Sequence, residues 1–156
     1  MVGQKTKTSR TAGPGRSVVP PRTLLILEDD ADRIQGFKSA VASLGREIGV
    51  RVWREAPAMM AECPAYFGRA CLISLDHDLE AAPGVADPGT GLDVAEFLSL
   101  HPPACPVILH TRNSDGRLAM HNRLVAARWT VATVPPREPD WIQHSWLPTA
   151  RRLIGL

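Results

Sequence analysis

The chain has 156 residues, of which 44% are hydrophobic and 22% are charged, with a formal net charge of +2 at pH 7. This composition is typical of one globular domain and argues against a disordered chain. No apolar stretch approaches the length of a membrane span, and the amino terminus lacks the apolar core of a secretory signal, so a cytoplasmic location without membrane contact is expected.

Residues 1–22 differ in composition from the rest of the chain. The segment contains no acidic residue and five basic ones, which are Lys5, Lys7, Arg10, Arg16 and Arg22. It is rich in Thr, Ser, Gly and Pro and has no apolar period, which predicts a disordered basic tail before a single domain over residues 23–156. A weak contact of this tail with RNA or another polyanion is compatible with its charge, although a solvated tail is the commoner explanation.

Strands and helices are predicted to alternate five times after this tail. Apolar or alternating runs predict strands at 23–27, 50–53, 71–75, 106–109 and 129–134. Helical spacing of apolar residues predicts helices within 31–45, 56–67, 92–100, 114–125 and 141–153. The Pro- and Gly-rich loop 80–90 is expected to cover the crevice at the strand ends and to be mobile. Such alternation predicts a doubly wound α/β fold, in which helices cover both faces of a five-stranded parallel sheet.

Polar side chains gather where three of these strands end. The first strand is followed by Glu28, Asp29 and Asp30, the third by Asp76, His77 and Asp78, and the fourth by His110, Thr111, Arg112 and Asn113. The carboxyl ends of parallel strands meet at one edge of the sheet, where α/β proteins hold their ligands. One Asp in such a place is usually a turn residue, but three clusters together favour a functional site.

This arrangement resembles the response-regulator receiver domain over residues 23–154. In that family the acids after the first strand hold Mg²⁺, the Asp that ends the third strand (here Asp76) accepts a phosphoryl group, and a hydroxyl (here Thr111) contacts the phosphoryl oxygens. The resemblance implies a flavodoxin-like sheet with strand order 2-1-3-4-5. Receivers usually have a Lys before a Pro at the end of the fifth strand, whereas Val134 precedes Pro135 here. The cation that would pair with an acyl phosphate is therefore missing from that position.

The same strand ends are more similar to a subfamily of this fold, the cyclic-phosphate processing receiver domain. The similarity rests on three motifs, which are Asp76-His77-Asp78-Leu79, Thr90-Gly91 and His110-Thr111-x-Asn113-x-x-Gly116. It implies that the chain hydrolyses or otherwise processes cyclic phosphates made in RNA repair or nucleotide metabolism. The partner would then be a nucleotide, an ADP-ribose derivative or an RNA end that carries a cyclic phosphate.

Opening a cyclic phosphodiester needs a group that activates water and a group that protonates the departing oxygen. Imidazoles suit both roles because their pKa lies near neutrality. His77 and His110 follow neighbouring strands if the order is 2-1-3-4-5, so they are the predicted catalytic pair. Asp76 or Asp78 would orient an imidazole or bind a metal ion.

Phosphate binding is predicted for Thr111, Arg112 and Asn113, together with the backbone N–H groups that begin the fourth helix. His121 lies on the apolar face of that helix, where packing against the core is the commoner role. It is kept as an additional candidate because it can lean toward the same edge.

Two other functions remain open. An atypical receiver would signal through Asp76 or by docking a partner; the intact Asp76 and Thr111 favour it, and the missing lysine and the extra histidines oppose it. A metal-dependent phosphoesterase would use Mg²⁺ or Mn²⁺ to generate its nucleophile. The candidate ligands for that ion are Glu28, Asp29, Asp30 and Asp76. The sequence does not separate metal-dependent hydrolysis from hydrolysis by two imidazoles.

Overall fold

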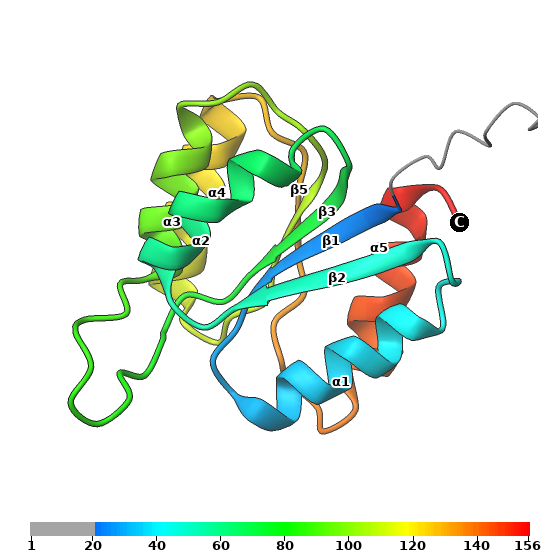
Figure 1. The fold of residues 1–156 in the computed structure, drawn as a ribbon, viewed down its shortest axis with the longest axis horizontal. Coiled ribbons are helices and arrows are strands. Elements are labelled where there is room, and N and C mark those ends of the chain that lie inside the picture. The colour runs from blue at the N-terminus through cyan, green and yellow to red at the C-terminus, as the bar shows by residue number, and fades with distance from the viewer. Residues whose placement is uncertain (1–20) are drawn as a thin grey trace, which may run out of the picture.

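The structure is a computed structural model that describes residues 21–156, so the predicted tail over residues 1–20 lies outside the described residues. Its sheet is parallel and has the order β2-β1-β3-β4-β5, which confirms the predicted flavodoxin-like topology (Figure 1). The strands are β1 (Arg22–Leu27), β2 (Ile48–Trp53), β3 (Ala70–Leu75), β4 (Val107–Leu109) and β5 (Val131–Thr133). Arg22 was predicted to belong to the tail, but it pairs with Ile48 as the first residue of β1.

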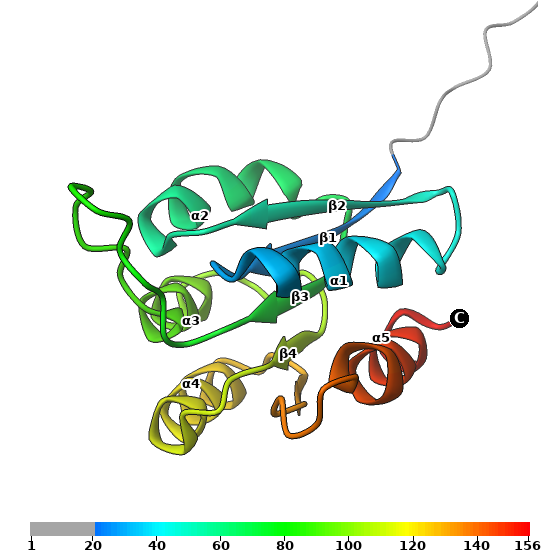
Figure 2. The ribbon, with the colours of Figure 1, turned by 90° about the horizontal axis from the view of Figure 1, so that it is seen from below.

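Helices cover both faces of the sheet, as Figures 1 and 2 show. One face carries α1 (Ala31–Ala42) and α5 (Leu147–Ile154), and the other carries α2 (Ala56–Glu62), α3 (Gly91–Ser99) and α4 (Ser114–Ala126). A 3₁₀ turn, η1 (Cys63–Tyr66), follows α2, and a π-helix, η2 (Ile142–Trp146), precedes α5. Two of the predicted helices are thus divided, each beside a proline that has no N–H to donate. No helix among residues 21–156 is long and apolar enough to cross a bilayer.

Two apolar cores flank the sheet because successive residues of each strand face opposite sides. Leu72 of β3 packs with Phe37 and Trp146 on the α1/α5 side, and its neighbour Ile73 packs with Leu98 on the α2/α3/α4 side. The central strand β3 is therefore buried on both faces, as its uninterrupted apolar run predicts. Each fully buried side chain of this kind contributes about 1.5–3 kcal/mol to folding.

The register of the strands brings the predicted site residues to one edge of the sheet. Leu27 of β1 pairs with Leu75 of β3, and Leu75 pairs with Leu109 of β4. The next residue of each strand therefore lies at the same level of the sheet. These three residues are Glu28, Asp76 and His110.

Gly91 begins α3 in close contact with the end of β3. Its N–H donates to the carbonyl of His77 at 2.9 Å, and a Cβ at this position would collide with the carbonyl oxygen of Asp76. Gly91→Ala is expected to lower the free energy of unfolding by about 1–3 kcal/mol or more, because backbone must move. Urea denaturation measures this loss. Gly68→Ala is the control, since a Cβ there meets nothing within 4 Å, and equal losses in both variants would contradict the close contact.

Candidate active site

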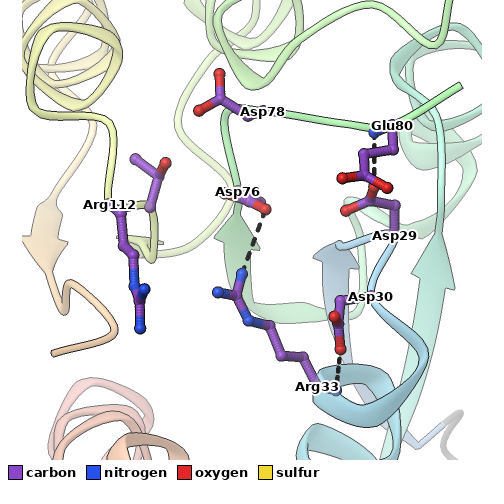
Figure 3. Close-up of a pocket in the computed structure, with 8 residues that line it drawn as sticks. Asp29, Asp30, Arg33, Asp76, Asp78, Glu80 and Arg112 are labelled. Atoms are coloured by element: carbon purple, nitrogen blue, oxygen red, sulfur yellow. Dashed lines mark hydrogen bonds and ion pairs between the residues drawn. The ribbon is translucent and has the colours of Figure 1, made fainter. Parts of the chain in front are cut away.

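A pocket of about 330 Å³ opens at the carboxyl edge of the sheet, and most of its lining side chains are charged (Figure 3). The lining residues are Asp29, Asp30, Arg33, Asp76, Asp78, Glu80, Thr111 and Arg112. The pocket thus combines predicted residues from all three strand ends, and it adds Arg33 and Glu80, which the sequence did not single out. The remaining candidates lie below or beside the pocket.

Glu28 is fully buried beneath the pocket. Its Oε1 accepts the backbone N–H of Asp29 at 3.0 Å and that of Asp30 at 2.9 Å, and its Oε2 lies 3.2 Å from Nε2 of His110. Burial raises the pKa of this carboxyl. The hydrogen bonds from His110 and Asp30 and the charges of His110 and Arg33 outweigh burial, so the pKa of Glu28 is lowered overall. Glu28 is therefore ionised at neutral pH.

Asp76 follows β3 directly and is 5% exposed. Its Oδ1 accepts the backbone N–H of His77 at 2.7 Å, and its Oδ2 lies 3.7 Å from a guanidinium nitrogen of Arg33 (Figure 3). Burial, helped by the negative charge of Glu28, raises the pKa of Asp76 more than the charges of His110 and Arg33 lower it. Ionisation of Asp76 is therefore less favourable in the folded chain than in water.

Three carboxyl groups form a cluster suited to a divalent cation. Glu28, Asp29 and Asp76 each offer one oxygen, and these oxygens lie within 4.8 Å of one another. Such hard oxygen ligands are preferred by Mg²⁺ and Mn²⁺, so the donor set fits the ion that the sequence predicts. Asp30 is not part of this cluster, because its Oδ1 caps α1 by accepting the N–H of Arg33 at 2.9 Å.

Two arginines lie in the lining of the pocket that holds the carboxyl cluster. Arg33 reaches from α1 to within 3.6 Å of Oε2 of Glu28 and 3.7 Å of Oδ2 of Asp76. Arg112 lines the same pocket and is anchored by a hydrogen bond of 2.9 Å from its Nε to the carbonyl of Pro136. The pocket therefore contains cations although the end of β5 offers none. The sequence signal for Arg33 is its place one helical turn after the cap residue Asp30.

His77 packs against the first turn of α4 and does not line the pocket. Its Nδ1 lies 2.8 Å from Oδ1 of Asp78, and a Cβ on Gly116 would come within 2.6 Å of the ring. The hydrogen bond from His77 is the main cause of the lowered pKa of Asp78. The imidazole thus orients a carboxylate that does line the pocket.

Asn113 holds the same carboxylate from the other side. Its Oδ1 accepts the N–H of Gly116 at 2.8 Å as the cap of α4, and its Nδ2 donates to Oδ1 of Asp78 at 3.1 Å. In this arrangement Asn113 positions Asp78, and its role in phosphate binding stays a prediction. This leaves Thr111 and Arg112 as the predicted phosphate-binding residues that reach the pocket.

His110 is fully buried on the opposite side of the sheet from His77. Its Nδ1 lies 2.7 Å from Oγ of Ser74, and its ring packs against Phe37 and Trp141 in the α1/α5 core. The expected pair of catalytic imidazoles is therefore not formed, because the sheet separates the two rings.

Two further expectations concern residues beside the pocket. His121 is half-buried on α4 and does not line the pocket, so the structure gives it no part in the site. The loop 80–90 was expected to cover the crevice, but within the described residues Glu80 is its only member in the lining. The backbone N–H of Glu80 donates to Oδ2 of Asp29 at 2.6 Å (Figure 3). The rest of the loop lines a neighbouring pocket that shares Asp29 and Glu80 with the first; its lining includes Ala81, Ala82, Pro83, Val85, Ala86 and Pro88.

The raised pKa of Asp76 predicts an effect on stability. The pKa of such a carboxyl is higher in the folded chain than in the unfolded chain. Between these two pKa values the folded chain binds more protons, so the free energy of unfolding falls as the pH rises. Without divalent cations, Asp76→Asn is therefore expected to raise the melting temperature at pH 7 and to have a smaller effect near pH 4. Thermal unfolding at both pH values, with the exposed Asp32→Asn as control, measures this. A lower melting temperature of Asp76→Asn at pH 7 would contradict the assignment.

Comparisons with known proteins agree with this fold and place the site within one family. The response regulator receiver domain from Rhodospirillum rubrum has a TM-score of 0.56 at 19% identity, covering 85% of this chain and 90% of that one. The response regulator domain of Thermotoga maritima CheB has a TM-score of 0.61 at 12% identity, covering 87% and 98%. A CheY-like receiver domain from Methanospirillum hungatei has a TM-score of 0.59 at 15% identity, covering 86% and 94%. At such identities these likenesses show the fold alone.

A search of curated proteins gave no match. The family model of the Cyclic-phosphate processing Receiver domain matches residues 23–126, which include every residue of the pocket lining. The chain therefore belongs to the cyclic-phosphate processing receiver domain family.

Proposed function

We propose that this protein is a metal-dependent phosphoesterase that opens a cyclic phosphate. The observation that carries the proposal is one pocket whose lining holds carboxylates suited to a divalent cation together with Arg33 and Arg112. Guanidinium groups bind phosphate oxygens in bidentate fashion. Membership of the family supports a cyclic phosphate as the substrate class, carried by a nucleotide, an ADP-ribose derivative or an RNA end.

The charge of the pocket supports a requirement for a metal ion. Six carboxyl groups lie in or beneath it and two guanidinium groups accompany them. Two like charges 4 Å apart repel each other by about 4 kcal/mol at an effective dielectric constant of about 20. A phosphate anion is therefore repelled by this pocket until a cation binds to Glu28, Asp29 and Asp76.

The chemistry follows from the positions of the side chains. A bound Mg²⁺ or Mn²⁺ would lower the pKa of a coordinated water and polarise a phosphate oxygen. Arg33 and Arg112 hold the non-bridging oxygens and stabilise the charge that develops on them. Asp78, oriented by His77 and Asn113, accepts a proton from the attacking water. The water oxygen forms a bond to phosphorus, one ring P–O bond breaks, and the departing oxygen takes up a proton from solvent, to which Asp78 releases the proton it accepted.

A receiver that signals through Asp76 is the second candidate. The observation in its favour is that Asp76 and Thr111 line the same pocket, with Arg33 as a cation beside the carboxylate. In this alternative an oxygen of Asp76 would attack the phosphorus of a phosphoryl donor, the bond from phosphorus to the donor's leaving group would break, and an aspartyl phosphate would form as that group departs. The partner would then be a signalling protein that docks to the phosphorylated domain.

A panel of substrates separates these functions. The chain is incubated with 2′,3′-cyclic nucleotides, ADP-ribose cyclic phosphate and RNA that ends in a 2′,3′-cyclic phosphate, each with Mg²⁺, Mn²⁺ or EDTA. We expect ring opening of at least one substrate with a divalent cation and none with EDTA. Ring opening that EDTA leaves unchanged would contradict the metal requirement, and a complete lack of turnover would favour the receiver.

A further inference from the structure

A line of buried polar groups connects η2 with the carboxyl cluster. It consists of Trp146, Ser74, His110 and Glu28, all fully buried, and is called the buried relay below. Nε1 of Trp146 donates to Oγ of Ser74 at 2.9 Å, and this Oγ lies 2.7 Å from Nδ1 of His110. Nε2 of His110 lies 3.2 Å from Oε2 of Glu28. The relay thus runs through the core from η2 to the carboxyl cluster beneath the pocket.

We propose that His110 is a positioning residue, which Trp146 and Ser74 hold in place so that it fixes the Glu28 carboxylate for cation binding. The inference rests on the proposed metal site and adds residues that do not touch the cation. It also gives His110 a function different from the catalytic one that the sequence predicts.

The donors and acceptors of the relay set its direction. An indole nitrogen can only donate, so Oγ of Ser74 accepts from Trp146, and this hydroxyl can in addition donate its own proton to Nδ1 of His110. Nε2 of His110 carries a proton both in the imidazolium and in the neutral imidazole that accepts at Nδ1. This N–H then donates to Oε2 of Glu28. Each of these buried side chains has a hydrogen-bond partner in this arrangement.

The surroundings of the relay are apolar. The Phe37 ring packs against His110 with centroids 5.0 Å apart and against Trp146 with centroids 4.9 Å apart. Burial of a hydroxyl and an imidazole in such a core is unfavourable unless their hydrogen bonds are complete. What the relay provides in return is an N–H aimed at a carboxylate of the cation cluster. Hydrogen-bond partners of metal ligands orient those ligands, and their loss weakens metal affinity by about 10–100-fold.

The π-helix η2 has an indole at each end, with Trp141 as its N-cap and Trp146 as its last residue. In an α-helix, residues five apart point about 140° away from each other. In a π-helix the hydrogen bonds run from i to i+5, so residues five apart lie nearly above one another. Trp141 and Trp146 consequently both contact Phe37, and Trp141 also stacks on His110 with centroids 5.8 Å apart. The unusual helix geometry is thus explained by the placement of the relay.

Mn²⁺ binding by the full chain, measured by isothermal titration calorimetry, tests the relay apart from activity. His110→Ala is expected to weaken Mn²⁺ affinity by about 10–100-fold. His110→Gln retains an N–H donor for Glu28 and is expected to restore most of that loss. Ile108→Val is the control, because Ile108 lies on the same strand and in the same core but outside the relay.

Nuclear magnetic resonance provides a second readout of the relay. The indole N–H signal of Trp146 is assigned by its absence in Trp146→Phe. We expect this signal to shift when Mg²⁺ is added to the wild-type chain and not to shift in Ser74→Ala, in which the connection to His110 is broken. If His110→Ala does not fold, the relay is tested with Ser74→Ala alone, by its Mn²⁺ affinity and by the response of its Trp146 indole signal to Mg²⁺.

The possible failures are distinguishable. Wild-type Mn²⁺ affinity in both His110→Ala and Ser74→Ala would overturn the relay and leave the metal site standing, as would an indole signal that does not respond to Mg²⁺. A wild-type chain that binds no Mn²⁺ would overturn the metal site and the relay together. Loss of Mn²⁺ binding in Asp29→Asn, without a change of the indole signal in the absence of metal, would confirm that the ion lies at the carboxyl cluster.

Discussion

Asp76→Asn is expected to reduce kcat/KM for a cyclic phosphate by about 10³-fold while the fold stays intact. The substitution removes one of three charged oxygens from the cation cluster. Metal ions contribute several kcal/mol of charge stabilisation in the transition state, and each 1.36 kcal/mol corresponds to a factor of ten in rate. Steady-state kinetics at saturating Mg²⁺ measures the loss. The same variant is expected to be more stable than the wild type, which separates an effect on the site from an effect on folding.

Asp32→Asn is the matched control for this prediction. It removes the same charge from the exposed first turn of α1, and Asp32 does not line the pocket. Its activity is expected to stay within about twofold of the wild type, since charges exposed to water interact weakly. Asp76→Asn with more than a tenth of wild-type activity would contradict the role of Asp76 in the cation cluster.

Arg33→Ala is expected to lower kcat by about 10²-fold. Arg33 is the guanidinium group closest to the buried carboxylates, at 3.6 Å from Glu28 and 3.7 Å from Asp76. The loss of one preorganised donor aimed at developing charge typically costs 10²–10³-fold in rate. Arg33→Lys keeps the charge but not the planar fork, so it is expected to fall between the wild type and the alanine variant. Activity assays at several Mg²⁺ concentrations measure both variants.

Lys38→Ala provides the control for Arg33, because Lys38 is an exposed cation on the same helix. A general effect of net charge on the attraction of an anionic substrate would appear equally in both variants. Equal losses for Lys38→Ala and Arg33→Ala would therefore show that Arg33 acts through the overall field and does not contact the phosphate.

The fold is predictable from the sequence because its strands are short, apolar and separated by helical patterns. The run Cys71–Leu75 is buried on both faces in the structure, as the absence of charged residues indicates. The acids after β1 and β3 also lie at one edge as predicted, since parallel strands end at the same side of a sheet. The divided helices near Pro64 and Pro148 were not predicted, because a local apolar period does not reveal which carbonyl each N–H contacts.

The placement of the two histidines depended on strand register, which the sequence does not reveal. Leu75 pairs with Leu109, so His110 lies level with Asp76 and on the same face of the sheet. His77, the next residue after Asp76, points to the opposite face. A register shifted by one residue would have put both imidazoles on the same face. Arg33 was missed for a related reason, since its contact with Asp76 depends on how α1 packs against the sheet.

The glycines of the sequence motifs have physical reasons that become apparent only in the structure. Gly91 allows α3 to begin against the carbonyl of Asp76, and Gly116 leaves room for the ring of His77. Together with the cap Asn113, these two residues fix the segment from Asp76 to Asp78 at the rim of the pocket. The motifs thus describe the support of the site as well as its reactive groups.

Phosphorus nuclear magnetic resonance of a 2′,3′-cyclic nucleotide incubated with the chain tests the metal-dependent phosphoesterase most directly. The predicted result is the appearance of a ring-opened phosphate monoester with Mg²⁺, and its absence with EDTA and in Asp29→Asn. A second sample contains acetyl phosphate in place of the cyclic nucleotide, and the same measurement then detects phosphorylation of Asp76. A stable phosphoryl group on Asp76, without conversion of any cyclic phosphate, would contradict the phosphoesterase and establish a signalling receiver in its place.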